Sequence, residues 1–155
     1  MPGSYPTEFR RILVPTSGTP VGEDTIRLAC SLAKKSKAKI FVVCVIKVGW
    51  TLPVDAESQA MVLQGEAALR KSETVADEID YEVETELLQA REVGPAIVDE
   101  AVERGVDVIV MGMGYKKKFG EFTLGDVVPY VLKNAPCPVL LFREPIAVPL
   151  EGTRR

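Results

Sequence analysis

Short apolar runs alternate along the chain with segments whose apolar residues recur at helical spacing. Four runs rich in β-branched residues predict strands that are buried in a sheet: Ile12–Pro15, Lys39–Ile46, Val106–Met111 and Val139–Phe142. In Glu82–Leu88, glutamate alternates with apolar or threonine residues, which predicts a more exposed strand near a sheet edge.

The segments between these strands predict helices. The first follows a turn in which Thr19 can cap the helix and Pro20 can occupy its first position. The second is expected from Asp55 to about Glu78, the third from Gly94 to Gly105, and the fourth up to about Asn134. Their apolar stripes are Ala56, Ala60, Leu63 and Ala67 in the second; Ile97, Val98, Ala101 and Val102, facing inward, in the third; and Val127, Val128, Val131 and Leu132 in the fourth.

The alternation of strands and helices predicts an α/β fold, an open doubly wound parallel sheet with right-handed crossovers and helices on both faces. Such sheets bind ligands beyond the carboxyl ends of their strands, where the strand order reverses. Two loops are expected to converge there, Pro15–Thr19 after the first strand and Gly112–Asp126 after the fourth.

Composition excludes several classes of function. The formal net charge of −3 argues against nucleic acid or an anionic membrane as partner. No apolar run approaches the ~20 residues that span a bilayer, and Met1–Arg10 lacks the apolar core of a signal peptide. The three cysteines, at 30, 44 and 137, form no CxxC pair, so a cytoplasmic location is expected. The sequence has no histidine, which excludes Ser-His-Asp catalysis and histidine-ligated metal sites.

Three stretches resemble a known family. Residues 11–18 read Arg-Ile-Leu-Val-Pro-Thr-Ser-Gly, residues 107–112 read Asp-Val-Ile-Val-Met-Gly, and residues 134–139 read Asn-Ala-Pro-Cys-Pro-Val. In this order and spacing they resemble the first strand and turn, the fourth strand, and the entry to the last strand of the universal stress protein family. The resemblance implies one such domain over residues 11–143, with an N-terminal extension (1–10) and a C-terminal tail (144–155). It implies five strands in the order 3-2-1-4-5 and, as in many members, a homodimer through the last strand, Val139–Phe142.

Nucleotide-binding members of that family carry the pattern G-x2-G-x9-G-(S/T) after the fourth strand, where backbone N–H groups approach the phosphates. Gly112 and Gly125 match the first and third glycines. Tyr115 falls on the second, with Gly114 one residue earlier, and Asp126 takes the hydroxyl position. The resemblance therefore implies a degenerate loop for an adenine nucleotide, ATP or AMP, with or without Mg²⁺.

These departures bear on phosphate binding. Tyr115 has a bulky side chain where glycine would let the backbone approach a phosphate. Asp126 brings a carboxylate to the phosphate end, although it could instead cap the helix that begins there. In the first turn, Ser17 replaces the aspartate usual in the family. Three lysines in the loop after the fourth strand could neutralise phosphates as point charges, or could form a solvated loop tip: Lys116, Lys117 and Lys118.

The candidate ligand contacts that the resemblance implies are Pro15, Thr16, Ser17, Val45, Met111, Gly112, Gly114, Lys116, Lys117, Gly125, Asp126 and Val127. The hypothesis is a non-enzymatic, homodimeric stress-response protein with a degenerate adenine-nucleotide loop. The alternative is a universal stress protein that has lost nucleotide binding and acts only through protein–protein contacts. A slow nucleotide hydrolase ranks last, because the sequence offers no Walker-type lysine and serine pair.

Overall fold

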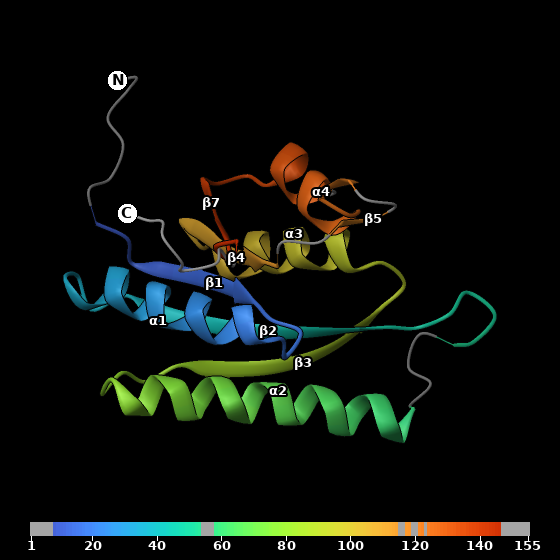
Figure 1. Cartoon of the computed structure of the whole chain (residues 1–155), viewed down its shortest axis with the longest axis horizontal. Coiled ribbons are helices and arrows are strands. Elements are labelled where there is room, and N and C mark those ends of the chain that lie inside the picture. The colour runs from blue at the N-terminus through green and yellow to red at the C-terminus, as the bar shows by residue number, and fades with distance from the viewer. Residues whose placement is uncertain (1–7, 54–57, 115–116, 119–120, 123, 147–155) are drawn as a thin grey trace, which may run out of the picture.

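A computed structural model describes residues 8–53, 58–114, 117–118, 121–122 and 124–146 of the chain. Its centre is a five-stranded parallel sheet in the order β3-β2-β1-β4-β7 (Figure 1). Because β7 is the fifth strand of this sheet along the chain, the predicted order 3-2-1-4-5 is confirmed. The strands are β1 Arg11–Pro15, β2 Lys39–Lys47, β3 Glu84–Ala90, β4 Val108–Met113 and β7 Val139–Arg143.

Four helices cover the two faces of the sheet (Figure 1). On one face lie α1 Pro20–Lys34 and α2 Gln59–Glu78. On the other lie α3 Val93–Arg104 and α4 Val127–Asn134. Among these described helices, none is long and apolar enough to cross a membrane.

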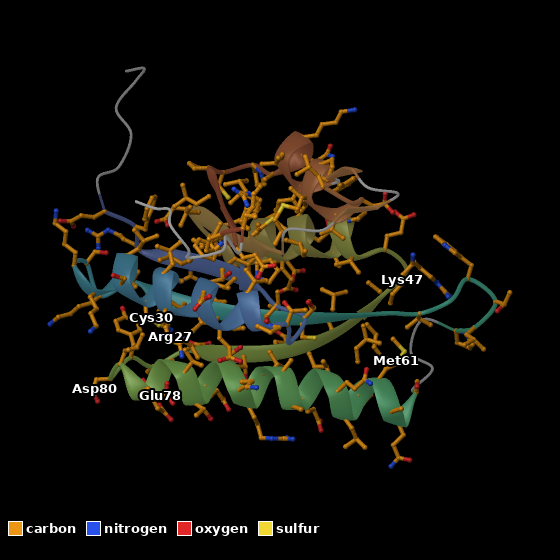
Figure 2. All side chains as sticks on the ribbon, in the orientation of Figure 1. Arg27, Cys30, Lys47, Met61, Glu78 and Asp80 are labelled. Carbon is orange, nitrogen blue, oxygen red and sulfur yellow. The ribbon has the colours of Figure 1, made fainter. Side chains whose placement is uncertain are left out.

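The central strands are apolar at successive positions because both of their faces are covered. In β1, Ile12 and Val14 pack into the core beneath α1 and α2, whereas Leu13 packs into the core beneath α3 and α4. Figure 2 shows Arg27 and Cys30 on α1 beside the C-terminal end of α2, where Arg27 pairs with Glu78 at 3.7 Å. Each face of the sheet thus has its own hydrophobic core, covered by α1 and α2 on one face and by α3 and α4 on the other.

The structure corrects several predicted boundaries. β3 begins at Glu84 and β4 at Val108, each two residues later than predicted, so β4 continues through Gly112 and Met113. α2 begins at Gln59, after Ser58, whereas Asp55, its predicted start, lies outside the described residues. A small hairpin that was not predicted lies in the loop after β4, with β5 at Lys117–Lys118 and β6 at Glu121–Phe122.

Five residues on the predicted apolar stripes are exposed: Ala60, Leu63, Ala67, Val102 and Leu132. Ala56, on the predicted stripe of α2, lies outside the described residues. In α2 the stripe prediction was wrong because the helix turns a different side to the sheet, burying Gly65, Ala68 and Leu69. A Cβ on Gly65 would overlap the Leu87 side chain of β3, so the absent side chain there lets α2 approach the sheet.

Several other predicted helix ends are correct in position, but not in every interaction. Pro20 is the first residue of α1, and α3 ends before Gly105, whose φ of 59° is left-handed. Thr19 and Asp126 occupy the N-cap positions of α1 and α4, yet neither side chain makes a capping hydrogen bond.

Candidate functional site

A cavity of about 490 Å³ opens at the carboxyl end of β4, between the start of α1 and the residues that lead into α4. Its described lining residues are Ser17, Thr19, Pro20, Val21, Gly112, Met113, Gly114, Leu124, Gly125 and Glu144. The two loops that were expected to converge, after β1 and after β4, therefore meet at one cavity, as a parallel sheet requires of its ligand site.

Gly112 lies where β4 passes closest to α1. A Cβ at this position would overlap the Thr25 hydroxyl and lie 3.3 Å from the Val21 carbonyl oxygen. The Thr25 hydroxyl is fixed, because it is buried and donates a hydrogen bond of 2.7 Å to that carbonyl. Gly112 is thus needed for helix packing, whether or not its backbone meets a ligand.

Gly125 is a glycine for a different reason. Its φ of 73° is left-handed, and a Cβ built there would meet no described residue within 4 Å. The backbone conformation, not crowding by the protein, disfavours a side chain at this position. The backbone of Gly125 therefore lines the cavity at a point that no described side chain fills.

The turn after β1 is tied to both neighbouring layers. The Thr16 amide donates to the Val43 carbonyl of β2 at 2.8 Å, and the Thr16 hydroxyl accepts from the Gly18 amide at 3.4 Å. Gly18 has a φ of 85°, and a Cβ there would lie 3.0 Å from the Cβ of Ala68 in α2. These contacts hold Ser17 at the cavity wall. On its other side, Ser17 also lines a shallower groove against α2.

Glu144 reaches the cavity from the end of β7. The register pairs Met113 with Arg143, and the Glu144 amide continues that ladder by donating to the Met113 carbonyl at 2.9 Å. The Glu144 Oε2 atom lies 2.9 Å from the position that a Cβ on Gly114 would take. A carboxylate thus lies against the residue expected to approach a phosphate.

Comparison with known proteins assigns the family. Residues 8–143 match the model of the Universal stress protein family. The chain belongs to this family. Universal stress protein MJ0531 of Methanocaldococcus jannaschii is 31% identical over 143 residues, which cover 88% of this chain and 84% of that protein.

Solved structures show the same fold. A universal stress protein from Archaeoglobus fulgidus superposes with a TM-score of 0.73 at 22% identity, covering 85% of this chain and 97% of the other. A universal stress protein from the same organism, solved in complex with dAMP, has a TM-score of 0.67 at 20% identity over 87% and 98% of the two chains. Another solved universal stress protein holds cAMP, and a family member from Arabidopsis thaliana has AMP bound.

The structure brings some of the predicted universal stress protein site residues together and not others. Ser17, Gly112, Gly114 and Gly125 line the same cavity. The predicted residues that are not among its lining residues are Pro15, Thr16, Val45, Met111, Asp126 and Val127. Val45, Met111 and Val127 pack instead into the core beneath α3 and α4, and Asp126 is exposed beside Gly125.

Tyr115 and Lys116 lie outside the described residues. Lys117 and Lys118 are described only as backbone, in β5. Sequence reasoning missed Glu144, which had been assigned to a loosely held tail. No sequence signal marked Glu144, because its place at the cavity depends on the register between β4 and β7.

The thiols contribute no reactive group to this site. Cys30 and Cys44 are buried, and burial raises the pKa of Cys30 to about 11 and that of Cys44 above its ordinary value. Burial also raises the pKa of Cys137, and the nearby Asp107 carboxylate adds to this shift. Within the described part of the chain, no group of three or more His, Cys, Asp or Glu residues could hold a metal ion.

Proposed function

We propose that this universal stress protein is a non-enzymatic stress-response protein that binds an adenine nucleotide in the cavity at the carboxyl end of β4 and works as a homodimer through β7. The observation that carries the proposal is the convergence of the Ser17 turn with Gly112, Gly114 and Gly125 at one cavity. The dAMP, cAMP and AMP held by structural relatives support an adenine nucleotide as the ligand.

The size and position of the cavity support this ligand class. Its volume of about 490 Å³ lies within the range of small-molecule sites. The start of α1, a helix of 15 residues, forms one wall through Thr19, Pro20 and Val21. The helix dipole makes this end partly positive, which favours an anionic group on the ligand.

A binding role agrees better with this wall than a catalytic one. The described lining residues supply backbone groups, the hydroxyls of Ser17 and Thr19, and the Glu144 carboxylate. Nucleotide hydrolysis would need a group that stabilises the charge developing on the phosphoryl oxygens. None of the described lining residues is a lysine or an arginine that could supply such a group, which favours a sensor over a hydrolase.

The alternative, a member that has lost nucleotide binding, has its own support. Asp126 is exposed beside Gly125, and the Glu144 carboxylate lies against Gly114. Both carboxylates lie beside glycines that were expected to approach the phosphates, where like charges repel unless other groups neutralise them. Measuring binding directly separates this alternative from the proposal.

The test compares two glycines that both have a left-handed backbone conformation. Gly125 (φ 73°) lines the cavity, whereas Gly105 (φ 59°) follows the end of α3, and a Cβ on either would meet none of the described residues within 4 Å. Replacing either glycine with alanine should cost about 1 kcal/mol of stability, because the left-handed backbone disfavours a side chain. Only Gly125→Ala should also weaken AMP and ATP binding, by about tenfold, since its methyl group would project into open space beside the ligand.

Isothermal titration calorimetry with AMP and ATP, with and without Mg²⁺, measures the affinities, and thermal melting measures the stability. Mass spectrometry of the supernatant after denaturing the purified protein identifies any nucleotide that it already holds. If the wild-type protein binds neither nucleotide at millimolar concentration, nucleotide binding is lost and the alternative holds. If Gly105→Ala weakened nucleotide binding as much as Gly125→Ala, the ligand would not bind beside Gly125.

A further inference from the structure

A second groove, of about 480 Å³, lies at the end of β3. It is lined by Trp50 from the loop after β2, by the last residues of β3 and by the first turns of α3. No described residue lines both this groove and the cavity at the end of β4. A ligand of the groove would therefore share no described contact with a nucleotide in the cavity.

The tryptophan of this groove is exposed, although the loop that carries it is held in place. The side chain of Trp50 is 70% exposed, and that of Leu52 in the same loop is also exposed. The Gly49 carbonyl accepts hydrogen bonds from the Leu52 amide, at 3.1 Å, and from the Arg91 guanidinium. The same guanidinium lies 5.4 Å from the centre of the Trp50 ring. A fixed aromatic ring left in water is typical of an interaction surface, where tryptophan is enriched.

The face of α3 that lines the groove combines small residues with carboxylates. Its members recur at helical spacing: Glu92, Pro95, Ala96, Asp99 and Glu100. Glu100 is paired with Arg104 at 2.7 Å. Glu92 and Asp99 are exposed, and neither makes a hydrogen bond or ion pair with another described residue. The small side chains of Pro95 and Ala96 leave room between these two carboxylates for a side chain of a partner.

The charges around the groove sum to a negative value. Residues 85–104 hold five carboxylates and two arginines. The nearest lysine of β2 is Lys47 (Figure 2), which is paired in register with Ala90, and including it gives a net charge of −2. The start of α3 adds only about half a positive charge. Residues 54–57, which lie outside the described part of the chain, include two acidic residues and no basic one.

We propose that this groove docks a basic segment of a partner protein. An arginine or lysine of the partner lies between the carboxylates of Glu92 and Asp99, with its aliphatic chain against the ring of Trp50. Basic side chains suit such a site, because their apolar stem packs on an aromatic ring while the charged head meets carboxylates. An acidic segment would meet like charge there, which opposes its binding.

The chain has a single tryptophan, so the fluorescence of Trp50 reports binding at the groove. The probes are three capped hexapeptides in which alanine alternates with arginine, with citrulline or with glutamate. Citrulline has the shape of arginine without its charge. We expect the arginine peptide to change the fluorescence saturably, the citrulline peptide to bind about fivefold more weakly and the glutamate peptide to cause no change. High salt should weaken the arginine peptide, since it screens the attraction.

Substitutions test the contacts one at a time. Glu92→Gln and Asp99→Asn should each weaken the arginine peptide by about threefold, as expected for exposed charge pairs. Trp50→Ala, measured by calorimetry, should weaken it by about tenfold. The matched control is Asp77→Asn, because Asp77 is an exposed aspartate of α2, on the other face of the sheet. This control changes the net charge equally and should bind as wild type does. Thermal melting of each variant confirms that it is folded.

Four results would overturn the proposal. The first is a wild-type protein that binds no arginine peptide at millimolar concentration. Equal binding of the arginine and citrulline peptides would show that the groove does not recognise charge, and tighter binding of the glutamate peptide would assign it an acidic partner. Equal weakening by Asp77→Asn and Asp99→Asn would mean that net charge alone attracts the peptide. None of these results bears on nucleotide binding, which the glycine variants of the cavity test separately.

Discussion

The two edges of the sheet differ in how they meet solvent. Within the described part of the chain, β3 and β7 are the two edge strands of the sheet and pair with β2 and β4 respectively (Figure 1). On β3, Glu84 pairs with Lys39 and Glu86 pairs with Arg104. On β7, Leu140 and Leu141 are 38% and 37% exposed. The glutamates of β3 thus form ion pairs, whereas β7 has two exposed leucines beside the charged Arg143.

Charged side chains on an edge strand oppose pairing with another chain, whereas an apolar edge invites it. The charges of the β3 edge are also engaged within the molecule. Arg104, the partner of Glu86, also donates a hydrogen bond of 2.7 Å to Glu100, and its guanidinium lies 4.7 Å from the centre of the Phe41 ring. The difference between the edges indicates that β7, not β3, is the edge suited to a second subunit.

The largest expected effect is on this edge. Leu140→Glu should convert a homodimer into a monomer, because antiparallel pairing of two β7 strands would bring both new carboxylates into one interface. Burying unpaired charges there costs several kcal/mol, equivalent to a loss of affinity of about 100-fold or more. Light scattering after size-exclusion chromatography, over a range of protein concentrations, measures the mass.

Leu63→Glu is the matched control for that change. Leu63 is an exposed leucine on α2, on a different face of the molecule, so the same substitution there should leave the dimer intact. A wild-type protein that remains monomeric at high concentration would contradict pairing through β7, and dissociation by Leu63→Glu would move the interface to α2.

The sheet was the most predictable part of this molecule. Buried parallel strands are apolar on both faces, so runs such as that around Ile40 stand out without any knowledge of the partner. Helix faces were less predictable, because periodicity identifies an apolar stripe but not what covers it. Leu63, Val102 and Leu132 were all placed on such stripes, and all are exposed. Their side chains lie beyond the area that the sheet covers.

The cavity also has residues that the sequence predicted and residues that it did not. Gly112 and Gly125 could be predicted from their spacing, but the reason for each glycine could not. Gly112 is needed for packing against α1, whereas Gly125 is needed for its left-handed backbone conformation. Glu144 could not be found from a motif. Its place at the cavity depends on the register between β4 and β7, which joins residues about thirty positions apart. Contacts that arise from register are a property of the folded sheet.

A smaller effect is expected when the β3 edge is made to resemble β7. Glu86→Val removes a half-exposed partner of Arg104, and should cost about 0.5 kcal/mol, since Arg104 keeps its bond to Glu100. It also replaces an edge charge with a residue that favours strands. In a Leu140→Glu background, which removes pairing through β7, this variant should self-associate weakly through β3.

Sedimentation velocity at increasing concentration detects that association. Glu103→Val, on the exposed side of α3, is the control for added apolar surface, and should not associate. If both variants stay monomeric, Glu86 does not protect the edge, and the difference between the edges then rests on the leucines of β7 alone.

The smallest effect concerns the ion pairs themselves. Lys39 Nζ and Glu84 Oε2 are 3.3 Å apart, but their side chains are 63% and 56% exposed. A double-mutant cycle with alanine at both positions should give a coupling energy of about 0.5 kcal/mol or less, which high salt abolishes. The same cycle for Arg104 and Glu100, whose side chains are 23% and 14% exposed, should give about 1 kcal/mol and should be less sensitive to salt. If Lys39 and Glu84 proved the stronger pair in chemical denaturation, the charges on β3 would stabilise the fold. If they are the weaker pair, as expected, their main effect at the edge is to oppose pairing with another chain.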